Sequence, residues 1–322
     1  MSNFNYQRAV VILPERLGDS LFHTPSLRLL KTQRPDIKLD VIALSTLCAE
    51  VLQNNPYIDA VHVLPSKSRT KILAQHYDVT LLLHTHDLAQ QYAEWLAIET
   101  IPISSPATPR HWSQHSLEFT CSLLGVDPYG IDGHYDLFPL ANNFEKVSSL
   151  LQASGHNDGD ILIGCHIGCH SIAKRGLKFW RSLTHPKAWP FENFVALEAA
   201  LRAKNPRIRL VLTGSQGEKR LGEKFIRYAP RTINLIDKTS VLDLAALMDR
   251  LTLFITPDTG VMHVACARKV GIVALFGPTQ LQVTGPHPMR DSYRVLQATN
   301  LADISTDEVL ATVIRHPDLL RA

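Results

Sequence analysis

The stretch "LTLFITPDTGVMHVA", residues 251–265, joins a strand-like apolar run to a helix-like run through a proline and three small or polar residues. The proline stops the strand, and Asp258 is well suited to cap the following helix. Thr259 and Gly260 offer backbone N–H groups that a diphosphate could approach closely. His263 lies one turn into the helix, on the same face as Thr259. The pattern indicates either an anion-binding turn at the end of a parallel strand or a capped helix with a buried histidine.

Apolar runs of strand length recur along the chain, with helix-period segments between them. A first series occupies residues 9–13, 39–44, 60–64 and 78–83, and a second series occupies 161–166, 208–214, 232–236, 251–255 and 271–277. Strands that alternate with helices are typical of parallel βαβ units. The polar stretch at 153–160 separates the two series. We therefore expect an α/β protein with two Rossmann-like, doubly wound parallel-sheet domains, one over residues 1–155 and one over residues 156–322.

The composition agrees with two ordinary globular domains. The 322 residues are 45% hydrophobic and 20% charged, with a formal net charge of +3. This charge is too small to indicate nucleic-acid binding, although an anionic small molecule or a membrane surface remains compatible with it. Five cysteines in a chain of this length do not form a disulfide framework, so reduced thiols are expected. Only a five-residue apolar run lies near the start and no run reaches the roughly 18 residues of a membrane span, which predicts a cytoplasmic protein.

Two further junctions in the second half also end a strand in a glycine-containing turn. In "LTGSQGEKR" (212–220) the turn holds Gly214 and Ser215, and Glu218 stands at the start of the next helix. Its carboxylate could accept hydrogen bonds from a ribose diol, or it could simply face the positive end of the helix dipole. In "FGPTQ" (276–280) the corresponding residues are Gly277 and Thr279. Since the carboxyl ends of parallel strands share one edge of a sheet, three such junctions together favour a nucleotide pocket.

The first half has its own strand-to-helix junction, in "VVILPERLGDSLFHTPSLRLL" (10–30). Gly18 and Asp19 lie at the turn into the helical run, where Asp19 is either a helix cap or a general base. Pro25 either kinks that helix or begins a second one. His84, in "HTH" (84–86) at another strand end, is a candidate for cleft-lining polar surface. No GxGxxG follows either first strand, which argues against a dehydrogenase.

Two further segments have unusual chemistry. "GCHIGCH" (164–170) does not have the cysteine spacing of the common zinc sites, so we expect no metal. The long segment 168–190 contains "KRGLKFWR" (174–181), whose Lys174 and Arg175 either grip an anionic oligosaccharide or lipid head groups, or form a solvated basic loop. The tail 305–317 combines a Ser/Thr start, acidic residues and an apolar stripe, which predicts a closing helix that packs either on its own domain or back on the N-terminal domain.

Taken together, these segments resemble glycosyltransferase family 9, the bacterial lipopolysaccharide heptosyltransferases. The similar segments are "RLGDSLFHTPSLRLL", "HPKAWPFENF", "LTGSQGEKR", "ITPDTGVMHVA" and "VALFGPT". They span nearly the whole chain in the family's order. The resemblance implies a GT-B architecture, in which two Rossmann-like domains face a central cleft, with the acceptor in the first and the nucleotide-sugar donor in the second.

The resemblance also implies roles for individual residues. Asp19 matches the family's catalytic base, Lys187 matches the lysine that neutralises the donor phosphates, and Glu218 matches the acidic residue at the donor ribose. Asp258, Thr259, Gly260 and His263 match the phosphate-binding turn. The sequence departs from the family at Gln280, where an acidic residue is usual, and in the longer segment 168–184.

The expected reaction follows from these matches. An acceptor hydroxyl attacks the anomeric carbon of ADP-heptose with inversion, without a metal ion or cofactor, and the acceptor is an anionic glycolipid of the lipopolysaccharide inner core. Such an enzyme would work as a monomer, with transient contact with the cytoplasmic face of the inner membrane. The alternatives are a different sugar or acceptor on the same scaffold, and a nucleotide-binding module without turnover.

Overall fold

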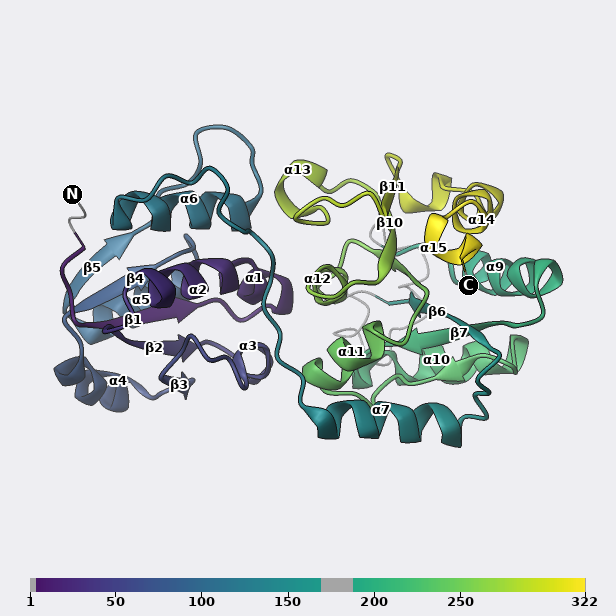
Figure 1. Cartoon of the computed structure of the whole chain (residues 1–322), viewed down its shortest axis with the longest axis horizontal. Helices are drawn as coiled ribbons and strands as arrows, with labels where there is room; N and C mark the ends of the chain where they lie inside the picture. The colour runs from purple at the N-terminus through teal and green to yellow at the C-terminus, as the bar shows by residue number, and fades with distance from the viewer. Residues whose placement is uncertain (1–3, 169–187, 322) are drawn as a thin grey trace. The chain divides into compact units, whose positions relative to one another are not determined.

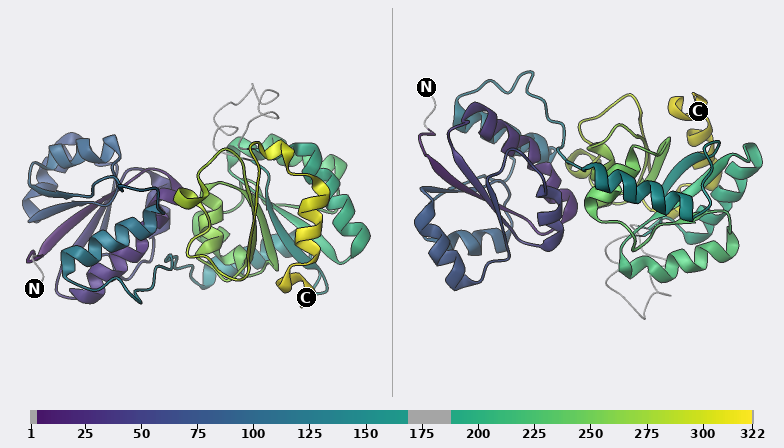
Figure 2. Two further views of the ribbon diagram at one scale, coloured as in Figure 1. Left: turned by 90° about the horizontal axis from the view of Figure 1, so that it is seen from above. Right: turned by 60° about the horizontal axis from the view of Figure 1, so that its bottom comes forward.

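The computed structural model describes residues 4–168 and 188–321, and these form two compact units, Met1–Phe138 and Pro139–Ala322. Each unit contains one parallel sheet with helices on its faces (Figure 1, Figure 2). The expected α/β class with two Rossmann-like parallel-sheet domains is therefore confirmed. Helix α7 (Ala141–Ala153) packs against α11 (Val241–Met248) and so belongs to the second unit, whereas the polar stretch used to divide the sequence follows this helix.

The sheet of the first unit has the strand order β3-β2-β1-β4-β5. Its strands are β1 (Arg8–Leu13), β2 (Lys38–Ala43), β3 (Ala60–Val63), β4 (Val79–Leu82) and β5 (Glu99–Pro102). The apolar run of β1 is buried along its length because helices cover both of its faces. Strand β1 pairs with β2 on one side and with β4 on the other. The connections change direction between β1 and β4, which is the topological switch point where ligands of such sheets bind.

The helices of the first unit follow the strand ends. They are α1 (Leu17–Phe22), α2 (Thr24–Gln33), α3 (Thr46–Leu52), α4 (Lys67–Leu73), the 3-10 turn η1 (Ala74–His76), α5 (Asp87–Leu96) and α6 (Trp112–Leu124). Pro25 lies in the first turn of α2, so the run after β1 forms two helices rather than one kinked helix. His23, between them, occupies the N-cap position of α2.

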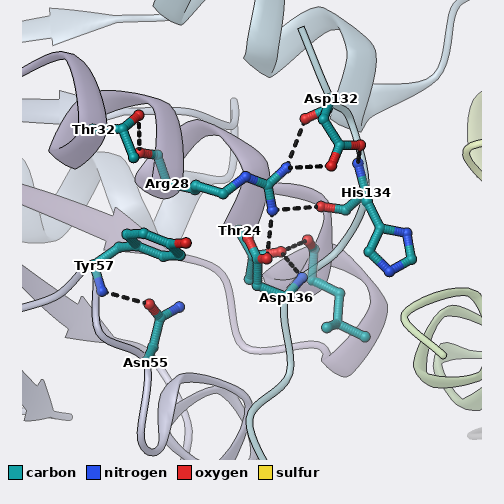
Figure 3. A network of polar contacts seen from close by, with 9 residues as sticks. Thr24, Arg28, Thr32, Asn55, Tyr57, Asp132, His134 and Asp136 are labelled. Atoms are coloured by element: carbon teal, nitrogen blue, oxygen red, sulfur yellow. Dashed lines mark hydrogen bonds and ion pairs between the residues drawn. The ribbon is translucent and has the colours of Figure 1, made fainter.

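A polar network fastens the last part of the first unit to α2 (Figure 3). Arg28 donates hydrogen bonds to the backbone carbonyls of His134 and Asp132, at 3.0 and 2.6 Å, and forms an ion pair with Asp136. The backbone N–H of Asp136 donates to Thr24 Oγ1 at 3.0 Å. These contacts hold segment 132–136 in place, since an irregular segment has no ladder of its own for its polar groups.

The sheet of the second unit has the order β11-β10-β9-β6-β7-β8. Its strands are β6 (Ile161–His166), β7 (Ile208–Thr213), β8 (Ile233–Asn234), β9 (Leu253–Pro257), β10 (Gly271–Phe276) and β11 (Tyr293–Gln297). Strand β6 pairs with β7 on one side and β9 on the other, so the switch point lies between β6 and β9. Strands β6, β9 and β10 are buried at every position.

The remaining helices of the second unit cover this sheet. They are α9 (Phe191–Lys204), η3 (Gln216–Glu218), α10 (Lys219–Tyr228), α12 (Gly260–Cys266), α13 (Leu281–Thr284), η4 (Leu301–Asp303), α14 (Thr306–Ile314) and α15 (Pro317–Leu320). The predicted closing helix is α14, whose N-cap Ser305 accepts from the N–H of Glu308. Its Val309 and Val313 join the core of the second unit and it packs on α9, so this helix is part of the second unit.

The part of the chain that the structure describes bears on the expected membrane spans and cysteines. No helix there is long and apolar enough to cross a membrane. Four of the five cysteines lie there, and all four are buried free thiols. The expectation of reduced cysteines is thus met at Cys48, Cys121, Cys165 and Cys266.

Candidate active site

The turn between β9 and α12 lies at the switch point of the second sheet. Strand β9 ends at Pro257, and α12 begins at Gly260. Thr259, and not Asp258, occupies the N-cap position, so the expected Asp258 cap was assigned one residue too early. The hydroxyls of Thr259 and the buried Thr256 lie 3.2 Å apart. Asp258, Thr259 and Gly260 are each partly exposed, so a ligand can reach this turn.

His263 is buried one turn into α12, as one of the two interpretations of the sequence had it. Burial lowers its pKa to about 3, with a further contribution from His287. Burial also lowers the pKa of His287 to about 4. Both imidazoles are therefore neutral near pH 7, and each can offer one donor and one acceptor.

Glu218 lies in the turn after β7, where it closes a capping box with Ser215. Its Oε2 accepts from the Ser215 backbone N–H at 2.6 Å and from the Ser215 hydroxyl at 2.9 Å. The side chain is buried, and its Oε1 lies 3.7 Å from Nε2 of His166. The interpretation of Glu218 as an acidic residue in the first turn of a helix is thus confirmed. Its contact with the donor ribose stays a prediction.

His166 is a site residue that sequence reasoning considered only as a possible metal ligand. It is buried at the end of β6, and its Nδ1 lies 3.3 Å from Thr213 Oγ1 at the end of β7. The parallel register pairs His166 with Thr213, so the alignment of the two strand ends was the signal that could have found this contact. Among the described residues, no group of His, Cys, Asp and Glu is arranged to hold a metal ion.

The turn after β10 carries Gly277 and Thr279 at the same edge of the sheet. Gly277 is buried and Thr279 is partly exposed. Within the described ranges, the shielded Oγ1 of Thr279 has no hydrogen-bond partner. Gln280 is exposed at the N-cap position of α13, where its side chain makes no capping hydrogen bond. The Thr279 hydroxyl can therefore form a hydrogen bond with a ligand.

In the first unit, Gly18 and Asp19 lie inside α1, directly after β1. Arg16 occupies the N-cap position, and Asp19 is in the first turn, so the interpretation of Asp19 as the helix cap was wrong. Gly18 is buried and Asp19 is partly exposed. The Ser20 hydroxyl donates to the backbone carbonyls of Pro14 and Arg16, both at 2.9 Å, and so fixes the turn that carries Asp19.

His84 follows β4 and therefore lies at the same sheet edge as the β1 turn. Its ring stacks on Trp112 of α6, with centroids 4.3 Å apart and an interplanar angle of 26°. Burial, together with the nearby charges of His86 and Arg16, lowers the pKa of His84 to about 4. The contact with Trp112 could not be predicted from the sequence, because the two residues belong to separate elements.

Three predicted residues, Lys174, Arg175 and Lys187, lie outside the described residues, as do the second cysteine and histidine of "GCHIGCH". The structure therefore gathers the remaining donor candidates at one edge of the second sheet. It gathers Gly18, Asp19 and His84 at the corresponding edge of the first.

Comparison with known proteins shows which family the chain resembles. A family model described as glycosyltransferase family 9 (heptosyltransferase) matches residues 181–311. Lipooligosaccharide heptosyltransferase 2 of Haemophilus influenzae is 23% identical over 297 residues, which cover 86% of this chain and 85% of the relative. Lipopolysaccharide heptosyltransferase 3 of Escherichia coli is 24% identical over 299 residues, covering 81% and 80%.

Solved structures show the same fold. A family 9 glycosyltransferase from Veillonella parvula has a TM-score of 0.81 at 22% identity and covers 99% of both chains. The E. coli ADP-heptose lipopolysaccharide heptosyltransferase II has a TM-score of 0.77 at 18% identity, covering 98% of this chain and 99% of its own. The E. coli heptosyltransferase WaaC with ADP has a TM-score of 0.73 at 17% identity, covering 95% and 98%. The fold is GT-B, and the family model and the relatives show that the chain is similar to the heptosyltransferases of glycosyltransferase family 9.

Proposed function

We propose that this glycosyltransferase moves a heptose, with inversion, from ADP-L-glycero-D-manno-heptose to an inner-core acceptor of lipopolysaccharide. The observation that carries the proposal is that relatives named as heptosyltransferases of lipopolysaccharide or lipooligosaccharide match more than four fifths of the chain. ADP is the nucleotide in one structure of the same fold, which supports an ADP-linked donor. An acceptor anchored in lipid would bring the enzyme into transient contact with the cytoplasmic face of the inner membrane.

The reaction is a direct displacement at the anomeric carbon. The acceptor hydroxyl oxygen forms a bond to that carbon, the bond from the carbon to the diphosphate oxygen breaks, and ADP leaves. Asp19 takes the hydroxyl proton, a role supported by its partial exposure in the turn after β1. Attack from the face opposite the leaving group inverts the anomeric configuration.

The donor is assigned to the second unit. Thr259 and Gly260 would present backbone N–H groups to the diphosphate, and the resemblance adds Lys187 as a cationic partner. Glu218 would accept from the ribose hydroxyls through Oε1, because Oε2 is already engaged by Ser215. These assignments require no metal ion to stabilise the leaving group.

The test is mass-spectrometric detection of sugar transfer from ADP-heptose to Kdo-containing lipid A. Asp19→Asn should lower kcat by roughly 10²- to 10⁴-fold while ADP still binds. Asp158→Asn, in an exposed loop, is the matched control and should keep the wild-type rate. Transfer by Asp19→Asn at the wild-type rate would remove Asp19 from the mechanism.

A second candidate is transfer of a different sugar, or to a different acceptor, on the same scaffold. It is favoured by Gln280, which replaces the acidic residue usual in the family and is exposed beside the β10 turn. A panel of ADP-, UDP- and GDP-sugars separates the two candidates. If none is turned over although ADP binds, the protein is a nucleotide-binding module.

A further inference from the structure

A group of polar and aromatic side chains beside the Asp19 turn has no assigned role beyond His84. We call it the His84 cluster. Its members come from the loop after β1, the junction of α1 with α2, the loop after β4 and the start of α6, and they are Glu15, His23, His84, His86 and Trp112. All four segments meet at the carboxyl edge of the first sheet, at its switch point.

The members of the His84 cluster contact one another in a chain. The ring of His84 lies between Trp112, on which it stacks, and His23, whose ring meets it edge-on at 5.8 Å between centroids. The ring of His86 is 6.1 Å from that of His84, and its Nε2 lies 3.9 Å from Glu15 Oε1. Elements far apart in sequence thus bring these groups together.

Serine hydroxyls hold Glu15 at one end of the cluster and His23 at the other. The Ser45 hydroxyl donates to the backbone carbonyl of Glu15 at 2.7 Å, which holds the β1 loop. Nδ1 of His23 lies 3.0 Å from Ser116 Oγ, which in turn lies 2.9 Å from Ser26 Oγ. The cluster is therefore preorganised rather than loosely exposed.

Four polar atoms of the cluster are shielded from solvent without a hydrogen-bond partner among the described residues: Glu15 Oε2, His23 Nε2, His84 Nδ1 and His86 Nδ1. His23 is fully buried. Buried polar groups in native proteins are nearly always paired, because leaving one unpaired costs about 1–3 kcal/mol. Four in one cluster indicate that a polar ligand completes their hydrogen bonding.

The charges of the cluster narrow the class of ligand. Burial lowers the pKa of His23 well below its usual range and that of His84 to about 4, so both are neutral near pH 7. The charged groups that act on His86 and His84 include the Glu15 carboxylate and the exposed Arg16 guanidinium, which have opposite charges. Neutral imidazoles that both donate and accept, with a carboxylate and a partly exposed indole, suit hydroxyls on a ring with an apolar face. They do not suit a phosphate.

We propose that Glu15, His84, His86 and Trp112 form a subsite that binds a sugar ring of the acceptor through its hydroxyl groups. The inference rests on the proposed function and deepens it: the subsite selects which ring of the acceptor is presented beside Asp19. The indole of Trp112 packs against the C–H face of the sugar ring. His86 and Glu15 form hydrogen bonds with the hydroxyls of that sugar. His23 supports His84 from below as a positioning residue.

The test compares Glu15→Gln and His86→Ala with His76→Ala, an exposed histidine of the same unit, as the matched control. Each of the first two should raise the acceptor KM about tenfold, the loss of roughly one hydrogen bond, and leave the donor KM unchanged. Trp112→Phe keeps an aromatic ring and should show a smaller effect. The control should match the wild type in both constants.

A binding measurement separates this subsite from the proposed reaction. Deacylated inner-core oligosaccharide, titrated by saturation-transfer NMR in the absence of donor, should bind the wild type and His76→Ala and lose affinity in Glu15→Gln and His86→Ala. Binding with this pattern but no heptose transfer would refute the proposed function and keep the subsite. Folded Glu15→Gln and His86→Ala proteins with wild-type acceptor KM and oligosaccharide affinity would refute the subsite, as would a crystal structure with oligosaccharide bound elsewhere and only water at these atoms.

Discussion

Replacing Gly168 with alanine tests the environment of Glu218 directly. Gly168 follows β6, and a Cβ built there would overlap Oε1 of Glu218 and lie 2.6 Å from its Cδ and 2.7 Å from its Cγ. Real Cβ atoms essentially never come this close to another heavy atom. Glu218 cannot simply swing into solvent, because it is buried and its Oε2 is held by two hydrogen bonds from Ser215.

The cost follows from the two ways in which the clash can be relieved. If the backbone at residue 168 shifts and Glu218 stays, the cost is that of overpacking, about 1–3 kcal/mol. If Glu218 leaves, each lost hydrogen bond to its carboxylate costs about 1.5–3 kcal/mol. The structure relaxes in whichever of these two ways costs less free energy. We therefore expect a destabilisation of about 1–3 kcal/mol, or a fall in Tm of roughly 2–12 °C.

Calorimetric melting and titration with ADP measure both consequences. Gly168→Ala should also weaken ADP binding, since either relief changes the position of Glu218 relative to the ribose. Gly159→Ala is the matched control, because a Cβ at this exposed glycine of the same unit meets nothing within 4 Å. The reasoning fails if Gly168→Ala melts with the control and binds ADP as the wild type does. Unchanged binding of 2′,3′-dideoxy-ADP by the variant would locate the loss at the ribose hydroxyls.

Three further predictions concern stability. Asp243 links α7 to α11. Burial alone would raise the pKa of Asp243, but its side-chain and backbone hydrogen bonds lower this pKa to about 2. Asp243→Ala should therefore lower the free energy of unfolding by about 2 kcal/mol near neutral pH, measured by urea unfolding. This contribution is present above pH 3.8 and is lost as the pH falls from 3.8 towards 2, so the variant and the wild type should converge in acid. The pKa of His263 is about 3 in the folded chain and 6.5 in the unfolded chain, so the unfolded chain binds more protons below pH 6.5. The free energy of unfolding should therefore fall by about 2 kcal/mol between pH 7 and 5. His263→Gln should reduce this dependence on pH, measured by calorimetry. Arg28→Ala leaves the partly buried Asp136 without its cation and should cost about 3 kcal/mol. The double variant Arg28→Ala with Asp136→Asn should recover most of this loss in the same unfolding assay.

The central strands were predictable because their physical signal is local. Strands β1, β2, β6, β9 and β10 are buried on both faces, so each appears in the sequence as a continuous apolar run. Two of the four edge strands, β5 and β11, were missed. Their side chains are mostly half-buried or exposed, so they lack such a run. The run at 232–236 forms only the two-residue strand β8.

Packing partners could not be predicted, because they depend on contacts between distant segments. Helix α7 joins the second unit through Val147 and Leu151 and through Asp243, and the composition of the loop after it does not reveal this. In the site, the glycine turns and Asp19 were recognisable from their place after strands. The contacts of Trp112 with His84 and of His166 with Glu218 were not, because each depends on how two separate elements align.

The electrostatics of the two sheet edges have a consequence for the reaction. The candidate residues Asp19, Glu218 and Asp258 are acidic. The partly buried His84 and the buried His263 are neutral near pH 7, with pKa values of about 4 and 3. A leaving diphosphate therefore gains no charge compensation from these imidazoles above about pH 5. Backbone N–H groups at the β9–α12 turn, together with the lysine that the resemblance supplies, would have to provide it. Because His84 and His263 stay neutral between pH 5 and 8, a change of rate in that range would not come from the charge of these two imidazoles.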